Sequence, residues 1–348
     1  MRIAVLTHMV HPVRSPYSGG LEMHTAMTVT RLVRAGHDVT VYARRGTEFD
    51  VPVEVVPVLP AEGHADEASR DAGTADACAR VLDSDAGAVL NNSLSRQPLL
   101  RLRDLPMLTV LHTPPTIEPV LAVLDEPGWT APNHHRWASV SAANALAWRH
   151  RLPQTDVVPN GIELHRWRSD ALPVPGRAVW TGRITQEKGL HLALDAARMA
   201  GMELHFAGPL SDPAYFEREI RPRLGAGTRY HGHLDHRRLP DLLATGEVYL
   251  ATPLWAEPFG LATVEAMAMG VPVAALLTGA MGEIVPQQAG ELAVHHTAEA
   301  LADAAGRARG RDRAAVLAWA CGFDADTMVA GYEELLVEAR QALAVPVR

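Results

Sequence analysis

The sequence predicts an α/β protein with two domains, each built on a parallel sheet. Its 348 residues exceed what one ordinary hydrophobic core contains and fit two domains. Each half also begins with the same pattern: a short apolar strand, a loop with glycine, a helix, an Ala-Gly pair and a second strand. Strands that alternate with helices form parallel sheets with right-handed connections. We therefore expect two Rossmann-like domains that face each other across a cleft.

The first half shows the pattern at its start. Arg2–Thr7 is short, apolar and rich in β-branched residues, which is typical of a buried parallel strand. After Gly19-Gly20, apolar residues recur at helical spacing over Leu21–Arg34, and Ala35-Gly36 ends that helix. The next strand is expected at Val39–Ala43. Further elements of this half are a helix with surface loops over Leu59–Val81 and strands at Ala88–Leu90, Met107–Leu111 and at or beside Ser139–Ser141.

The second half repeats the pattern. Ala178–Thr181 is the strand, Gly182–Gly189 the loop and Leu190–Met199 the helix, which Ala200-Gly201 ends. The following strand is Met202–Ala207. Further elements are strands at Thr228–Gly232, Val248–Thr252 and Val271–Ala275, and a long amphipathic helix over Phe323–Ala344.

A polar segment with prolines, Leu164–Pro175, is the expected linker between the domains. It places the first domain at residues 1–165 and the second at 166–325. Residues 326–348 are then a C-terminal helix.

Composition excludes several classes of protein. The net charge is −8, the pI is near 6.1, and no basic run stands out, which argues against a nucleic-acid partner. Cys78 and Cys321 are the two cysteines, and their separation fits neither a disulfide framework nor a zinc site. No stretch of about 20 uncharged apolar residues predicts membrane insertion, and the N-terminus does not read as a signal peptide. We therefore expect a cytoplasmic protein.

Two glutamates lie eight residues apart in an otherwise apolar stretch. Glu257 follows the strand Val248–Thr252, and the carboxyl ends of strands are where open α/β sheets bind ligands. Glu265 lies in the first turns of the next helix, where it can accept hydrogen bonds from ligand hydroxyls. The alternative is that both acids merely favour the start of a helix.

Two cations lie in the loop after the strand Ala178–Thr181. Arg183 offers a forked donor and Lys188 a compact charge, and together they suit a diphosphate leaving group. The alternative is a solvated loop with ordinary basic residues.

Two features of the first half point to the same kind of site. Gly19 and Gly20 allow close approach to a ligand at the start of a helix, although a simple turn is the alternative. His112 ends the strand Met107–Leu111 and can donate a hydrogen bond to a sugar hydroxyl, although it can also simply cap a loop.

These motifs resemble those of family 4 retaining glycosyltransferases, which have the GT-B fold. Glu257 to Glu265 matches the E-x7-E motif, and Gly182–Gly189 matches the G-R-x4-K-G element. The resemblance extends over essentially the whole chain. It implies that the first domain binds the acceptor, the second binds the nucleotide sugar, and the last helix crosses back to the first domain.

The resemblance also implies roles for single residues. Glu257 would contact the donor sugar, Glu265 the ribose, Arg183 and Lys188 the departing phosphates, and His112 the donor sugar. The remaining expected donor-binding residues are Gly19, Gly20, Gly208, His233, Leu234, Phe259, Gly260 and Leu261.

The implied reaction transfers a sugar from a nucleotide-diphosphate sugar to a hydroxyl, with retention of the anomeric configuration. No cofactor and no metal are expected, because the two cations replace a metal. UDP is favoured over GDP, ADP or dTDP as the carrier, and the expected acceptor is small and soluble or a secondary metabolite. The alternatives are a nucleotide-sugar epimerase, a phosphorylase of the same fold and a nucleotide-sugar sensor without catalysis. A dehydrogenase is least favoured, because the G-x-G-x-x-G fingerprint is missing.

Overall fold

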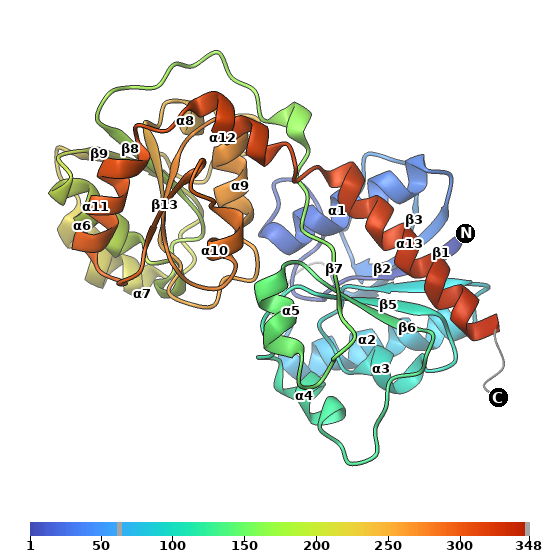
Figure 1. Ribbon diagram of the computed structural model, residues 1–348. Helices are drawn as coiled ribbons and strands as arrows, with labels where there is room; N and C mark the ends of the chain where they lie inside the picture. The colour runs from blue at the N-terminus through green and yellow to red at the C-terminus, as the bar shows by residue number, and fades with distance from the viewer. Residues whose placement is uncertain (61–64, 345–348) are drawn as a thin grey trace. The chain divides into compact units, whose positions relative to one another are not determined.

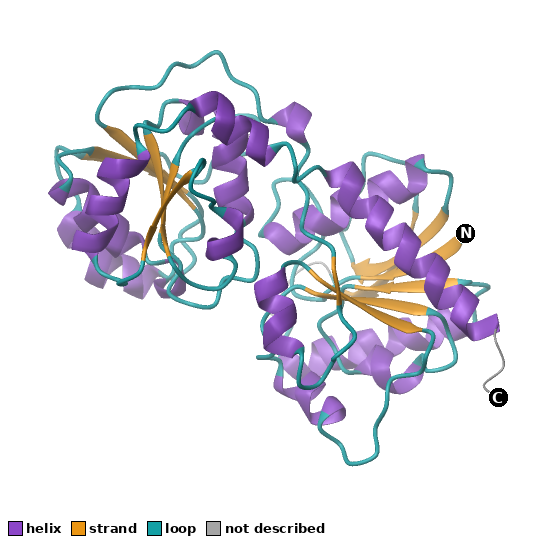
Figure 2. Cartoon of the chain, viewed as in Figure 1, coloured by secondary structure: helices purple, strands orange, loops and turns teal. Residues whose placement is uncertain are grey.

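The computed structural model describes residues 1–60 and 65–344 and divides into two compact units (Figure 1). Unit 1 contains Met1–Gly161 and the terminal segment from Ala325, and unit 2 contains Ile162–Asp324. Each unit has a central sheet with helices on both faces (Figure 2). The prediction of two α/β domains with parallel sheets is confirmed.

The sheet of unit 1 has seven parallel strands among the described residues, in the order β3-β2-β1-β4-β5-β6-β7. The order reverses between β1 and β4, the place where such sheets bind ligands beyond the carboxyl ends of the strands. The strands are β1 Arg2–Leu6, β2 Asp38–Arg44, β3 Glu54–Leu59, β4 Ala88–Asn91, β5 Met107–Leu111, β6 His135–Ser139 and β7 Asp156–Val157.

The helices of unit 1 cover both faces of this sheet, with α1 and α13 on one side and α2 and α3 on the other (Figure 1). Their apolar side chains pack between the layers and form the core. The helices are α1 Gly20–Arg34, α2 Glu67–Leu82, α3 Gln97–Arg101, α4 Glu118–Leu124, α5 Ala142–Trp148 and α13 Ala325–Ala344.

The sheet of unit 2 has six parallel strands in the order β10-β9-β8-β11-β12-β13. Its order reverses between β8 and β11, so the same kind of ligand position arises here. The strands are β8 Arg177–Thr181, β9 Glu203–Ala207, β10 Thr228–Tyr230, β11 Val248–Ala251, β12 Val273–Leu276 and β13 Gly290–Ala293.

The helices of unit 2 pack around a core that includes the fully buried Trp180 and Phe206. The α-helices are α6 Leu190–Met199, α7 Pro213–Tyr215, α8 Leu239–Ala244, α9 Leu261–Ala268, α10 Met281–Ile284, α11 Ala298–Ala308 and α12 Arg313–Ala320. Short 3₁₀ or π turns lie at Leu164–Arg166, Gln186–Lys188, Phe216–Ile220 and Arg221–Arg223.

The division between the units differs by a few residues from the expected one. Ile162 pairs with Asp324, and its N–H donates to the Phe323 carbonyl. The chain therefore enters unit 2 at residue 162, where residue 166 was expected, and leaves it after residue 324, where residue 325 was expected. The expected linker lies within unit 2, and its Trp167 is buried there with its ring edge-on to His236.

The terminal helix α13 belongs to unit 1 and contacts β4, β5 and β6. Residues 345–348 of the expected C-terminal helix, and 61–64 of the expected helix and loops over Leu59–Val81, lie outside the described residues. Within the described ranges, no helix has the length and apolar character that crossing a bilayer requires.

Candidate functional site

Lys188 and Glu257 form an ion pair at the carboxyl edge of the unit 2 sheet. Lys188 ends the short turn after β8, and Glu257 lies in the loop after β11, the two strands at which the order reverses. The Lys188 Nζ atom lies 2.6 Å from Glu257 Oε2, and the two side chains are 23% and 12% exposed. Partial burial strengthens such a pair relative to a surface pair. The expected approach of these two residues is therefore present within unit 2.

Backbone contacts explain why the two loops meet. The Leu254 N–H donates to the Glu187 carbonyl at 2.8 Å, and the Thr252 hydroxyl donates to the Lys188 carbonyl at 2.8 Å. These bonds fix the Lys188 turn against the start of the Glu257 loop.

A third loop supports Glu257 from the other side. The Ala280 N–H donates to the Glu257 carbonyl at 2.8 Å, and the Thr278 hydroxyl donates to the Trp255 carbonyl at 3.1 Å. Gly279 has φ +52°, and a Cβ there would overlap the Glu257 backbone. A glycine is therefore needed for this close approach.

Arg183 lies in the same loop as Lys188 but pairs with a different acid. Its guanidinium is 3.4 Å from Glu187 and 48% exposed. An exposed pair of this kind contributes little stability, so it does not prevent Arg183 from turning toward an anion. The structure brings Lys188 and Glu257 together and pairs Arg183 with Glu187.

Glu265 is a buried carboxyl group in α9. It is 6% exposed, and among the described residues none forms a hydrogen bond or ion pair with it. Burial raises the pKa of Glu265 to about 8, because the charged form loses its hydration. A buried acid without a partner is costly to a fold and is a reason to look for a ligand.

Glu265 and Glu257 both act electrostatically on Tyr249 of β11. Burial, followed by the charges of Glu265 and Glu257, raises the pKa of Tyr249, whose hydroxyl donates to the Thr181 carbonyl at 3.0 Å. Both acids follow β11 in the chain, Glu257 in the loop and Glu265 in α9.

The residues between Glu257 and Glu265 contribute mainly to packing and to the start of α9. Phe259 is 2% exposed and packs edge-on against Phe323, so its side chain belongs to the core and only its backbone is left for a ligand. Gly260 precedes α9 with φ +95°, and Leu261 begins the helix. Both are partly exposed at its N-terminus.

Gly208 holds two strand-end loops together. It has φ +149°, and a Cβ there would overlap the Gly182 carbonyl. Its N–H donates to the Gly232 carbonyl at 2.9 Å, which links the loop after β9 to the loop after β10. His233, exposed, and Leu234, partly exposed, follow in that last loop.

Unit 1 has its own polar cluster at the carboxyl ends of β1, β4 and β5. His112 follows β5, and its Nε2 atom is 2.8 Å from Oδ1 of Asn92, which follows β4. The His24 ring of α1 lies edge-on to His112, with ring centroids 4.6 Å apart. Burial, reinforced by the neighbouring His24 and His8, lowers the pKa of His112 well below its ordinary value. His112 is therefore a neutral imidazole at pH 7.

The Gly19-Gly20 loop leads to a buried carboxylate. Gly19 has an extended backbone, Gly20 begins α1, and a Cβ on Gly19 would lie 3.2 Å from Glu22 Oε2. Glu22 faces His8, which follows β1, at 3.4 Å. Burial alone would raise the pKa of Glu22, but His8 more than offsets this and the pKa is lowered. Glu22 is therefore ionised at neutral pH.

Sequence reasoning missed Asn92, His8, Glu22 and Trp255. His8 and Asn92 directly follow apolar strands, so the strand-end argument applied to His112 also pointed to them. Nothing local in the sequence pairs His8 with Glu22 or Asn92 with His112.

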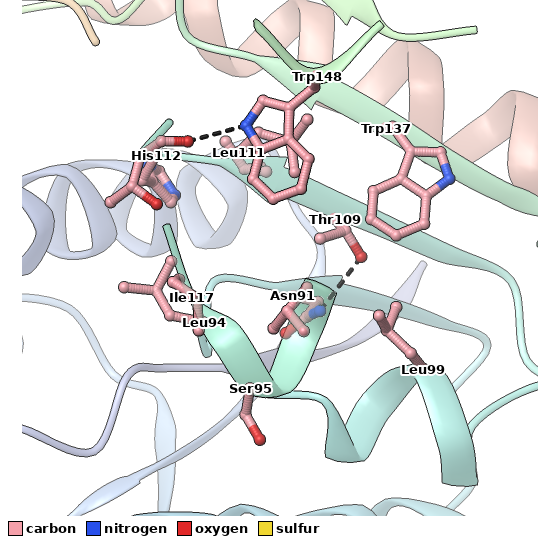
Figure 3. Close-up of a pocket in the computed structure, with 13 residues that line it drawn as sticks. Asn91, Leu94, Ser95, Leu99, Thr109, Leu111, His112, Ile117, Trp137 and Trp148 are labelled. Carbon is pink, nitrogen blue, oxygen red and sulfur yellow. Dashed lines mark hydrogen bonds between the residues drawn. The ribbon is translucent and has the colours of Figure 1, made fainter. Parts of the chain in front are cut away.

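A cavity of about 30 Å³ lies beside His112 in unit 1 (Figure 3). Trp137 and Trp148 are buried in its wall, and the Trp148 indole N–H donates to the Thr113 carbonyl at 2.8 Å. This volume accommodates no more than about two water molecules. Trp137 and Trp148 are therefore part of the hydrophobic core of unit 1.

Among the described residues, no group of three or more His, Cys, Asp or Glu side chains is arranged to hold a metal ion.

Comparison with known proteins matches unit 2 to a family. Residues 175–309 match the family model "Glycosyl transferases group 1". The glycogen synthase of Mycobacterium tuberculosis is 34% identical over 143 residues, which cover 38% of this chain and 34% of the relative. The chain thus spans about a third of the length of that relative. The phosphatidyl-myo-inositol mannosyltransferase of Mycolicibacterium smegmatis is 27% identical over 312 residues, 80% of each chain.

Solved structures match the whole chain. AviGT4, a glycosyltransferase involved in avilamycin A biosynthesis, has a TM-score of 0.74 at 23% identity and covers 99% of this chain and 98% of its own. Anabaena HepE, in complex with UDP and glucose, has a TM-score of 0.70 at 18% identity, with 96% and 99% covered. Residues 175–309 are thus similar to glycosyl transferases group 1, and the chain as a whole shares the fold of these glycosyltransferase structures.

Proposed function

We propose that this protein is a retaining glycosyltransferase that moves a sugar from a nucleotide-diphosphate sugar to a hydroxyl acceptor. The observation that carries the proposal is the arrangement at the carboxyl edge of unit 2. A Lys188–Glu257 ion pair and the buried, unpartnered Glu265 lie at the strands where the sheet order reverses. The match of residues 175–309 to a glycosyltransferase family supports the same function.

Each group has a distinct task in this reaction. Glu265 accepts hydrogen bonds from the ribose hydroxyls, and Lys188 and Arg183 bind the diphosphate. As the bond between the anomeric carbon and the phosphate oxygen breaks, negative charge grows on that oxygen, and the two cations stabilise it. Glu257 orients the sugar. His112 contributes a hydrogen bond to a sugar hydroxyl.

The acceptor hydroxyl attacks the anomeric carbon on the face that the phosphate leaves. The new carbon–oxygen bond forms, and the hydroxyl proton passes to the departing phosphate oxygen. The configuration at the anomeric carbon is therefore retained. The cations supply the charge stabilisation, and we propose that the reaction needs no metal and no cofactor.

We favour a UDP-linked donor over donors linked to GDP, ADP or dTDP. Support comes from the related HepE structures, which contain UDP, UDP with glucose, and UDP-glucose. Starch synthase IV, a structure with the same fold, contains ADP and acarbose. For the acceptor we propose a small soluble molecule or a secondary metabolite.

The first experiment is a thermal-shift screen with UDP, GDP, ADP, dTDP and their sugar conjugates. A ligand at a hundred times its dissociation constant stabilises the folded state by about 2.7 kcal/mol. Glu265→Gln should weaken the response to the active nucleotide. Glu299→Gln, which changes an exposed glutamate in the first turn of α11, should not. If all four nucleotide series leave the melting temperature unchanged, the proposal is wrong.

Product analysis separates this function from its rivals. NMR of the transferred sugar shows whether the anomeric configuration is retained. A product formed from sugar nucleotide alone would indicate an epimerase. A strict need for inorganic phosphate would indicate a phosphorylase.

A further inference from the structure

Trp255 contacts both members of the Lys188–Glu257 pair. Its indole Nε1–H donates to Glu257 Oε2 at 2.9 Å, the same oxygen that lies 2.6 Å from the Lys188 ammonium. The ammonium also lies 5.3 Å from the centroid of the Trp255 ring, within the range of a cation–π contact. One side chain thus holds the acid through its edge and the base through its face.

The ion pair occupies the two groups that the proposed reaction needs. A diphosphate carries more negative charge than a carboxylate and competes for the Lys188 ammonium. When Lys188 turns to the diphosphate, Glu257 loses its charged donor while its side chain remains only 12% exposed. A carboxylate left there without a donor would rotate toward solvent or take up a proton.

We propose that Trp255 is a positioning residue that keeps Glu257 and Lys188 in place while the donor exchanges with their ion pair. The indole N–H holds Glu257 Oε2 once Lys188 has left it, and the ring keeps the ammonium close. The Trp255 carbonyl accepts the Thr278 hydroxyl at 3.1 Å, which anchors the Trp255 backbone to the loop that also supports Glu257. This inference rests on the proposed glycosyltransferase function.

Two substitutions separate the edge of the ring from its face. Trp255→Phe removes the N–H and keeps an aromatic face, and a lost hydrogen bond to a charged group costs about tenfold or more. We expect kcat to fall about tenfold, with the donor KM within about threefold of the wild type. Trp255→Leu removes the face as well and should also raise the donor KM. Equal effects of both variants on KM, or an unchanged kcat in Trp255→Phe, would overturn the proposal.

Trp319→Phe is the matched control. Trp319 donates its indole N–H to the Ile284 carbonyl at 2.9 Å, so this variant loses an indole hydrogen bond of the same length in the same unit. It should leave kcat and the donor KM unchanged. A loss of kcat equal to that in Trp255→Phe would mean that the effect is a general loss of stability, and would overturn the proposal.

An NMR readout does not depend on activity. In the protein labelled with ¹⁵N-tryptophan, the indole N–H signal that disappears in Trp255→Phe, or in Trp255→Tyr if the first variant does not fold, belongs to Trp255. We expect this signal to move upfield in Glu257→Gln and to keep its downfield position when UDP binds the wild type. The positioning role would be contradicted if the chemical shift of this signal were unchanged in Glu257→Gln. It would also be contradicted if the signal lost its downfield position when UDP binds. If the wild type turns over no sugar nucleotide, the function proposed above fails. The chemical shifts still show whether the Trp255 indole N–H donates to Glu257.

Discussion

Oδ1 of Asn92 accepts a hydrogen bond from Nε2–H of His112 at 2.8 Å. An amide oxygen only accepts, so the proton of the neutral imidazole must lie on Nε2. The nitrogen that remains is Nδ1, with its lone pair. The sequence suggested that His112 donates to a sugar hydroxyl, whereas this arrangement leaves it an acceptor.

Replacing Asn92 by Asp should introduce a new pH dependence. A carboxylate beside Nε2 favours the imidazolium and raises the pKa of His112 from its lowered value. Protonation removes the Nδ1 lone pair, so kcat of Asn92→Asp should fall on the acidic side of about pH 7, where the wild type is flat. The measurement is kcat against pH. In a His112→Ala background the same substitution should leave the profile unchanged, and an acidic limb that persists there would refute this reading.

Nucleotide binding should release a proton from Glu265. Its pKa of about 8 means that the carboxyl group is largely protonated at pH 7 in the ligand-free protein. Ribose hydroxyls donate to the ionised form, so binding lowers this pKa, and affinity should rise with pH until it levels off above about pH 8. Calorimetry of UDP binding in buffers with different ionisation heats measures the released protons. Glu265→Gln corrects for protons released by UDP itself, and equal release from both proteins would contradict the prediction.

The same group should affect stability in a defined pH window. The pKa of Glu265 in the folded state lies above its ordinary value of 4.5, so the folded state binds more protons than the unfolded state between about pH 4.5 and about pH 8. Across this window the contribution of Glu265 to the free energy of unfolding should fall, by on the order of 5 kcal/mol. Glu265→Gln should lack this decrease in urea titrations. If the free energy of unfolding falls equally in the wild type and in Glu265→Gln, other titrating groups cause the decrease.

Gly279, in the loop before α10, and Gly282, within α10, offer a matched pair of substitutions. An alanine at Gly279 would overlap the Glu257 backbone and take up a strained positive φ, whereas at Gly282 its nearest contact is Leu277 at 3.3 Å. Gly279→Ala should lower stability by about 1–3 kcal/mol and reduce kcat, because Glu257 moves. Gly282→Ala should change both only slightly. Thermal melting and kcat measure the two effects, and similar values for both variants would show that Gly279 is not required.

Lys188 is the single lysine in the chain, which otherwise uses arginine. An amine-selective acylating reagent therefore modifies this side chain and, elsewhere, only the α-amine. Loss of the charge should reduce kcat/KM by about 2–4 kcal/mol, roughly 30- to 1000-fold. Activity and mass-spectrometric mapping are followed together, with and without UDP. Bound UDP should slow both the acylation of Lys188 and the loss of activity. Full activity after complete acylation of Lys188 would exclude a role of Lys188 in catalysis.

The sequence predicted what depends on local pattern and on topology. The strands at Arg2–Thr7, Val39–Ala43 and Ala178–Thr181 are present within a residue or two, because buried parallel strands are continuous apolar runs. The approach of Lys188 to Glu257 followed from the shared carboxyl edge of a parallel sheet.

The missed elements lack such patterns. β3 is an edge strand with Pro57 in its middle, and β13 begins at Gly290 and is only four residues long. Proline and glycine both argue against a strand when read locally, although an edge strand tolerates proline. The contact of Trp255 with Glu257 depends on rotamers within one loop, and loop paths are fixed by distant hydrogen bonds such as that from Ala280 to Glu257.

The membership of α13 in unit 1 has a consequence for biosynthesis. Its buried side chains, among them Met328, Tyr332 and Leu336, cover the sheet over β4, β5 and β6. The ribosome must make all of unit 2 before this helix exists, a delay on the order of ten seconds at typical elongation rates. During that interval the apolar side of the sheet in the nascent N-terminal half is not covered by α13. Chaperones that bind exposed apolar surface on nascent chains are therefore expected to bind it.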